Sequence, residues 1–191
     1  MKTLLLGGVA LALLPVTAQA QTLETGQGRL ELAGQAPPAC VLRAPTSSSG
    51  ANATFSATGA ATGEIRISEL VDPQTAQPRA ASINLVLPVI CNSAHRLTIT
   101  SGNGGMLRDG GNARNRQQSG GFGDFLGYQL STAWAGRTVT TLTTTAPGLA
   151  LDIPDGGAGD MSVTIAIPAG GGALVAGRYA DSVIINFQAA S

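Results

Sequence analysis

Beyond its second residue the chain contains no lysine, and its eleven basic residues are Lys2 and ten arginines. The chain after Lys2 therefore lacks the lysine of a P-loop and the lysine of a Schiff base. His95 is the only histidine, which excludes a metal centre built on two histidines. We expect no catalytic residue, no cofactor and no metal ion.

Charge is scarce as well as balanced. Charged residues make up 12% of the chain, and eleven acidic residues offset the eleven basic ones. Binding to nucleic acid needs a net basic surface, and binding to anionic lipid needs basic clusters. This composition therefore argues against both kinds of partner.

The first twenty residues follow the pattern of a secretory signal. Lys2 supplies a positive charge, an apolar run extends from Leu4 to Val16, and Ala18-Gln19-Ala20 fits a cleavage site. The run is too short to cross a bilayer comfortably as a membrane anchor. We expect cleavage after Ala20 and an exported chain that has no transmembrane segment. The remaining 170 or so residues suit one domain.

Two cysteines, Cys40 and Cys91, are present in the exported part. In an oxidising compartment a lone pair most often forms one disulfide. The loop that it closes has about 50 residues, which corresponds to roughly 4 kcal/mol in the chain-entropy description. The alternative is a reactive thiol, because His95 follows Cys91 by four positions.

Short apolar runs of period two, separated by Gly, Ser, Thr, Asn and Pro, indicate strands. Helical periodicity is missing, and the threonine-rich stretch 138–145 is a poor helix former. We expect an antiparallel sandwich or barrel. The alternating runs are Ile65–Ile67, Ile83–Val89, Leu97–Ile99, Tyr128–Leu130, Leu149–Ile153, Met161–Ile167 and Val183–Phe187.

Two segments read as loops. Residues 44–62 are rich in Ser, Ala, Thr and Gly, with one potential strand around Phe55. Residues 101–124 are rich in glycine and carry Arg108, Arg114 and Arg116, which suggests either an anion-binding patch or a solvated hairpin tip.

An alternating segment precedes the first cysteine. Gly28, Leu30, Leu32 and Gly34 fall on one face of an extended chain, and Pro37-Pro38 separates them from the domain that begins near Cys40. The last alternating run lies close to residue 191 and needs neighbours on both sides. These features suggest donor-strand complementation, in which one subunit's N-terminal strand completes the next subunit. The alternative is that residues 29–33 form the first strand of their own sheet.

Several short motifs, in order, resemble those of the spore coat protein U-like domains, which include the major pilins of archaic chaperone–usher pili. The resemblance extends from about Leu30 to Gln188. The motifs are Cys40-Val41-Leu42, Cys91-Asn92-Ser93 with Leu97-Thr98-Ile99, Gly127-Tyr128-Gln129-Leu130, Trp134-Ala135-Gly136, Ile167-Pro168-Ala169-Gly170 and the stretch from Gly177 to Val183.

This resemblance implies an all-β fold, namely an incomplete immunoglobulin-like antiparallel β-sandwich that is completed by donor-strand exchange. After the signal peptide over 1–20, it implies a donor-strand extension over 21–38 and a pilin domain over 39–191. It also implies a Cys40–Cys91 disulfide, and structural roles for Gly177, Tyr179 and Asp181. The ring of Tyr179 is expected to pack at the start of the last strand, and Asp181 to cap a turn.

The partners implied by the resemblance are a periplasmic chaperone, an outer-membrane usher and neighbouring subunits. The chain is then a structural subunit of a surface fibre, acting in adhesion or biofilm formation after passing through the periplasm. One alternative is a self-complete secreted coat, matrix or binding domain that does not polymerise. An exported hydrolase is the third reading, which the shortage of His, Lys and clustered acids disfavours.

Overall fold

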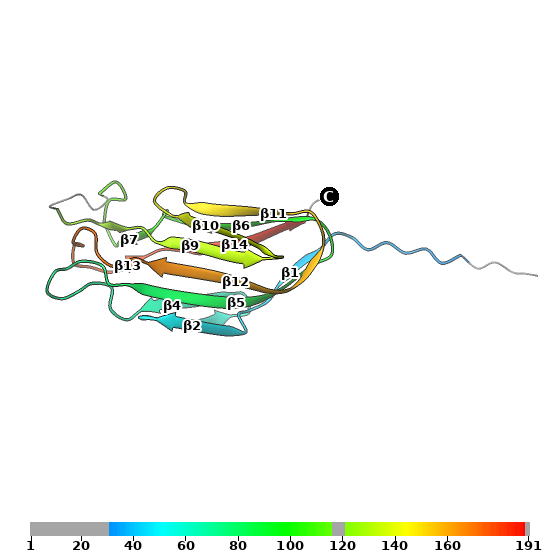
Figure 1. Cartoon of the computed structure of the whole chain (residues 1–191), viewed down its shortest axis with the longest axis horizontal. Coiled ribbons are helices and arrows are strands. Elements are labelled where there is room, and N and C mark those ends of the chain that lie inside the picture. Colours follow the sequence, from blue (N-terminus) through cyan, green and yellow to red (C-terminus); the bar gives the residue numbers. More distant parts are fainter. Residues whose placement is uncertain (1–30, 116–120, 190–191) are drawn as a thin grey trace, which may run out of the picture. The chain divides into compact units, whose positions relative to one another are not determined.

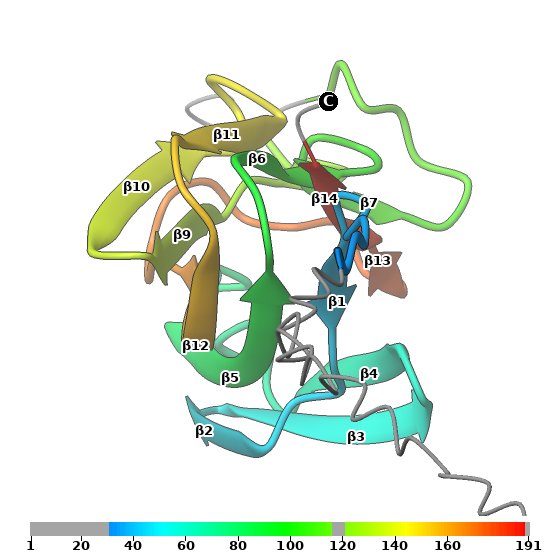
Figure 2. The same ribbon diagram turned by 90° about the vertical axis from the view of Figure 1, so that its right-hand side faces the viewer.

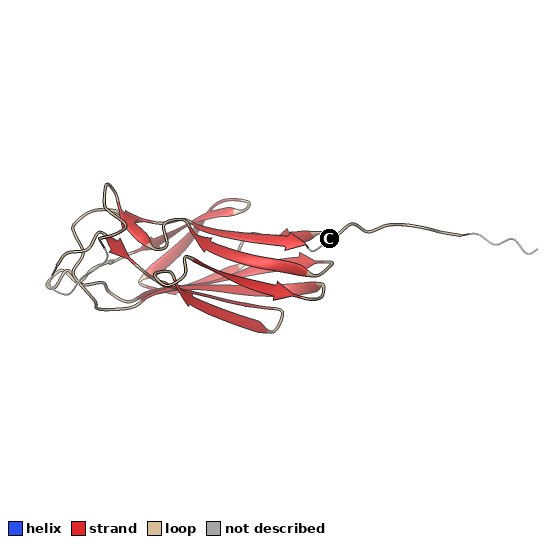
Figure 3. Cartoon of the chain, turned by 90° about the horizontal axis from the view of Figure 1, so that it is seen from above, coloured by secondary structure: helices blue, strands red, loops and turns tan. Residues whose placement is uncertain are grey.

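The alternating runs fold as strands in the computed structural model, which describes residues 31–115 and 121–189. These residues contain no helix, and hence none that is long and apolar enough to cross a bilayer (Figure 3). The strands are β1 (Cys40–Leu42), β2 (Ser47–Ala51), β3 (Ala53–Gly59), β4 (Thr62–Ile67), β5 (Ala81–Cys91), β6 (His95–Ser101), β7 (Met106–Arg108), β8 (Phe125–Leu126), β9 (Gln129–Trp134), β10 (Arg137–Leu142), β11 (Gly148–Ile153), β12 (Gly157–Ile167), β13 (Tyr179–Ala180) and β14 (Val183–Ala189).

Contacts divide the chain into a unit of residues 1–35 and a unit of residues 36–191. The second unit contains two main sheets (Figure 1). The larger sheet has the order β1-β5-β12-β9-β10, with β2 also paired to β5, and the smaller one has the order β11-β6-β14. All of these pairings are antiparallel, which confirms the predicted class of fold.

The two main sheets lie over one another as in an immunoglobulin-like sandwich (Figure 2). The chain crosses between the main sheets several times, from β5 to β6, from β6 back to β9, from β10 to β11 and from β11 to β12. Two small sheets, β13-β7-β8 and the β3-β4 hairpin, complete the unit.

The core lies between the inner faces of the sheets, because alternate residues of each strand point inward. Burying one such aliphatic side chain contributes roughly 1.5–3 kcal/mol. The most deeply buried side chains are Ile83 and Val89 of β5, Leu97 and Ile99 of β6, Leu130 and Thr132 of β9, and Met161 and Val163 of β12.

The expectation of a loop over residues 44–62 was largely wrong, although the potential strand around Phe55 is confirmed as β3. This segment contains β2, β3 and the start of β4. β2 has no apolar alternation because all five of its residues are exposed, and it is held by backbone pairing to β5. The threonine-rich stretch likewise forms β10, whose residues pair with β9.

A buried polar contact joins the two layers. The indole Nε1–H of Trp134 donates to His95 Nε2 over 2.8 Å, and His95 Nδ1 lies 2.9 Å from the carbonyl oxygen of Ser93. Both residues are 3% exposed, and the Phe187 ring packs against each of their rings. This bonding pattern assigns the proton of the neutral imidazole to Nδ1.

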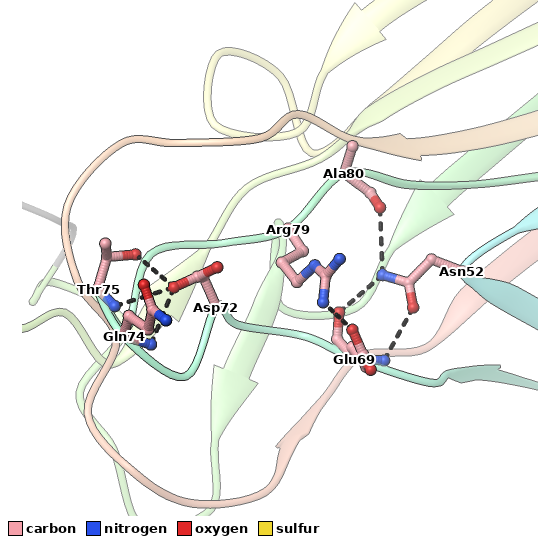
Figure 4. Close-up of polar contacts among 7 residues, drawn as sticks. All are labelled: Asn52, Glu69, Asp72, Gln74, Thr75, Arg79 and Ala80. Atoms are coloured by element: carbon pink, nitrogen blue, oxygen red, sulfur yellow. Dashed lines mark hydrogen bonds and ion pairs between the residues drawn. The ribbon is translucent and has the colours of Figure 1, made fainter.

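The segment between β4 and β5 is held by two side chains that organise backbone groups (Figure 4). The Asn52 amide donates to the carbonyl oxygens of Glu69 and Ala80 and accepts the Glu69 N–H. Asp72 accepts the N–H groups of Gln74 and Thr75 in a turn. These backbone hydrogen bonds lower the pKa of Asp72 below the ordinary range of an aspartate.

Replacing Trp134 with phenylalanine should lower the free energy of unfolding by about 1–3 kcal/mol, because His95 Nε2 then stays buried without a donor. Urea unfolding followed by far-UV circular dichroism measures the loss. The variants His95→Leu and His95→Leu/Trp134→Phe complete a double-mutant cycle. Purely additive losses would contradict a direct contribution from the hydrogen bond.

Removing the Asp72 carboxylate with Asp72→Ala should destabilise the folded chain at neutral pH. The pKa of Asp72 is lower in the folded chain than in the unfolded chain. The stabilisation that the carboxylate provides is therefore fully present at pH values above its unfolded pKa, and it is lost as the pH falls through its folded pKa. The gap in unfolding free energy between wild type and variant should therefore narrow in acid. Asp160→Ala is the control, because the Asp160 side chain makes no hydrogen bond or ion pair within the described residues. A gap that stays constant with pH would contradict the prediction.

Candidate functional site

Strand β14 is the outer strand of the smaller sheet. It pairs antiparallel with β6, from Val183 opposite Ser101 to Ala189 opposite His95. Within residues 31–115 and 121–189, no strand pairs with its other side. Half of its backbone N–H and C=O groups therefore point away from β6, which makes β14 a template for a further strand.

Strand β1 borders the same region from the larger sheet. It has three residues, pairs with the end of β5 and contacts β14 (Figure 2). No backbone ladder joins β1 to β14 in the described part of the chain. The two sheets thus meet along this side without being hydrogen-bonded to each other.

The apolar side chains along this side are only partly buried. Leu97 and Ile99 of β6 are 0% exposed, whereas the inward side chains of the neighbouring β14 keep intermediate exposure while packing on the core. We call this region the open edge. It consists of the strand β14 with the side chains Val183, Ile185 and Phe187, together with Cys40 and Leu42 of β1.

The segment before β1 presents an apolar side chain of its own. Leu32 is 90% exposed, and residues 31–39 form neither strand nor helix. An added Cβ at Gly34 would meet no atom within 4 Å. Of the residues proposed for strand donation, Leu32 and Gly34 lie in this segment, whereas Gly28 and Leu30 fall outside the described residues.

Asp181 organises the approach to the open edge. Its carboxylate accepts hydrogen bonds from Tyr128 OH at 2.7 Å, from the Asn103 N–H at 2.9 Å and from the Ser182 N–H at 2.8 Å. Ser101 Oγ donates to it as well. Burial raises the pKa of the Tyr128 phenol, so this group remains a donor. Asp181 thus fixes the turn that starts β14 against β6.

Tyr179 and Gly177 also have structural surroundings. The Tyr179 hydroxyl lies 2.8 Å from the carbonyl oxygen of Val175 and 2.9 Å from that of Gly123. Gly177 has a φ of 151°, and a Cβ there would lie 2.9 Å from the Arg108 side chain. The ring of Tyr179 packs against the core beside the final turn.

The arginine-bearing loop does not present its first arginine as a free cation. Arg108 Nε donates to Asp124 Oδ1 over 2.5 Å, and Asn115 Nδ2 donates to Asp124 Oδ2 over 3.0 Å. The Asn115 amide and then Arg108 lower the pKa of Asp124. Arg114 is exposed, and Arg116 lies outside the described residues. The Arg108 guanidinium is therefore engaged by Asp124 of the same loop and stabilises that loop.

The two cysteines form a disulfide between Cys40 and Cys91, whose Cα atoms lie 4.1 Å apart as directly paired residues of β1 and β5. The expected disulfide is thus confirmed, neither cysteine is a free thiol, and the alternative of a reactive Cys91 beside His95 was wrong. The imidazole of His95 is instead engaged by Trp134.

Sequence reasoning missed several residues that build this region. Tyr128 was treated as part of a strand and Ser101 as the start of a loop, and neither was identified as a partner of Asp181. His95 was considered only as a catalytic group. Such contacts join residues tens of positions apart in the sequence, so no local sequence pattern predicts them.

Comparisons with known proteins place the fold in a family. A profile of the Spore Coat Protein U domain matches residues 30–186, which is most of the chain. No curated protein and no solved structure matches. This domain is associated with chaperone–usher pilus subunits, and the family is one of structural pilin and coat domains, not of enzymes. The chain belongs to the Spore Coat Protein U domain family.

Proposed function

We propose that this chain is a structural subunit of a chaperone–usher surface fibre and that it polymerises by donor-strand exchange. The observation that carries the proposal is the open edge. β14 lacks a neighbour on one side within the described residues, and its inward side chains remain partly exposed. A strand laid along β14 satisfies its backbone groups and covers Val183, Ile185 and Phe187 together.

The segment before β1 has the composition of that strand. β14 has seven residues, which span about 23 Å in extended form. Residues 21–38 are long enough to supply a strand of this length and a connection to the next subunit. Leu30 and Leu32 are the apolar side chains offered to the edge, and each contributes roughly 1.5–3 kcal/mol when fully buried. Gly28 and Gly34 permit close backbone approach.

The partners and location follow from this assembly. Residues 1–20 direct export, residues 21–38 form the donor extension and residues 39–191 form the acceptor domain. A periplasmic chaperone covers the open edge in transit, and the outer-membrane usher exchanges the chaperone for the extension of a neighbouring subunit. The finished fibre lies on the cell surface and serves adhesion or biofilm formation. No chemistry is required of the subunit, in keeping with a family of structural domains.

The polymer should survive denaturing electrophoresis without heating. Material sheared from cells should give a ladder that collapses to one band on boiling, because strand exchange traps subunits kinetically. Leu32→Asp should remove the ladder while leaving the exported monomer, since a carboxylate cannot enter an apolar edge without a partner. Gln35→Asp, which adds the same charge on the other face of the segment, should keep the ladder.

Two other outcomes would contradict different parts of the proposal. A ladder from Leu32→Asp like that of the wild type contradicts the assignment of Leu32 to the acceptor edge. A single monomer band from the wild-type chain, heated or not, contradicts polymerisation and supports the self-complete secreted domain.

Substitutions on β14 test the acceptor side. Ile185 faces the core and should become fully covered in the polymer, whereas Ile184 faces outward and is 62% exposed. Ile185→Ala should weaken each joint by about 2 kcal/mol, so that the ladder collapses at a lower temperature. Ile184→Ala should leave the collapse temperature unchanged. Equal effects of the two variants would contradict an added strand at β14.

A further inference from the structure

A second feature lies at the end of the open edge, where three side chains of metal-binding types meet. Cys40 begins β1, Cys91 ends β5 opposite it, and His95 begins β6 after a short turn. One ligand atom from each of these residues lies within 4.8 Å of the other two. Cys91 and His95 are buried and Cys40 is partly exposed.

We propose that in the dithiol state, with the disulfide open, Cys40, Cys91 and His95 form a binding site for a thiophilic divalent cation such as Zn²⁺. The site holds the junction of β1, β5 and β6 together when the covalent bond is absent. It applies to the chain before oxidation or after reduction, and it is independent of whether the subunit polymerises.

The donors suit a four-coordinate ion once the disulfide is open. Zinc binds thiolate sulfur at about 2.3 Å and imidazole nitrogen at about 2.0–2.1 Å, so tetrahedral ligands lie roughly 3.5–3.8 Å apart. In the disulfide the two sulfur atoms are bonded to each other and must separate to that spacing after reduction, while a His95 nitrogen lies within 4.8 Å of both. Two soft thiolates and one imidazole favour zinc over magnesium or calcium, which prefer oxygen. A water molecule takes the fourth position, reached from the partly exposed Cys40 side.

The surroundings of His95 match those of a ligating imidazole. Nδ1–H donates to the carbonyl oxygen of Ser93, the kind of outer contact that orients metal-bound histidines. Nε2 is unprotonated, and its lone pair accepts the indole N–H of Trp134. A metal ion bound at this nitrogen replaces that hydrogen bond. Trp134 is the only tryptophan in the chain, so its emission reports on the exchange.

The chemistry balances with a phosphine reductant. Phosphorus gives two electrons to the Cys40–Cys91 bond and takes an oxygen atom from water, and the two protons of that water complete the two thiols. Binding of the cation then releases those two protons, because thiolates are the ligands. His95 Nε2 accepts the Trp134 indole N–H and therefore carries no proton to release.

The experiment titrates the whole exported chain with Co²⁺, a spectroscopic substitute for Zn²⁺, after reduction by a phosphine and under exclusion of oxygen. The reduced chain should bind one Co²⁺, with thiolate charge-transfer absorption, tetrahedral visible bands and a changed Trp134 emission. Added Zn²⁺ should displace it. His95→Gln should weaken binding at least tenfold, and Cys91→Ser should abolish it. The oxidised chain should show none of these bands.

Two controls distinguish metal binding at the folded site from metal binding by the two thiols of an unfolded chain. Circular dichroism of oxidised His95→Gln verifies that this variant folds, and a titration in concentrated urea measures binding by the unfolded chain. Absence of the bands from the reduced wild type overturns the proposal. It is also overturned if His95→Gln binds as tightly as the wild type, or if the unfolded chain does.

Discussion

The pairing of β5 with β12 is the contact on which the rest of the sandwich depends. The two strands pair along their full length, from Cys91 opposite Gly157 to Ala81 opposite Ile167. Their inward side chains form most of one wall of the core, and β1, β2 and β9 attach to their outer sides. The residues of β5 and β12 that face the smaller sheet are positioned by this pairing, and β9 is aligned with them through β12.

The same arrangement explains why burial declines toward β14. The centre of each sheet is covered by the opposite layer, so Val89 and Leu97 are fully enclosed. At the side where β1 and β14 meet, no backbone ladder joins the two sheets within the described residues. The inward side chains of β14 lie along this side and are partly exposed, and they supply the apolar surface that our proposed assembly uses.

Much of the fold was predictable, because burial imposes a period of two on the inner strands. The runs Ile83–Val89, Leu149–Ile153 and Val183–Phe187 became β5, β11 and β14. β2 was missed, since an exposed outer strand needs backbone pairing but no apolar alternation. The pattern located the last strand, but it did not reveal that its inner face is only partly covered.

The residues around the candidate site were less predictable. Two cysteines in an exported chain indicate a disulfide, and the resemblance to the family pointed to Asp181 as a turn residue. The partners of Asp181 come from β6, from the turn after it and from the residue before β9, and only the folded chain brings them together. Likewise, the contact between Trp134 and His95 crosses 39 positions of sequence and two layers.

The disulfide also determines how the domain bears mechanical load. Cys40 is the first residue of β1, so tension applied to the chain before it reaches the sulfur bridge immediately. The force then passes through covalent bonds into β5, the strand with the longest ladder, and bypasses the three residue pairs of β1. A short strand at the margin of a sheet would otherwise be peeled away easily by such tension. The disulfide carries the force instead, so the backbone pairs between β1 and β5 are not loaded.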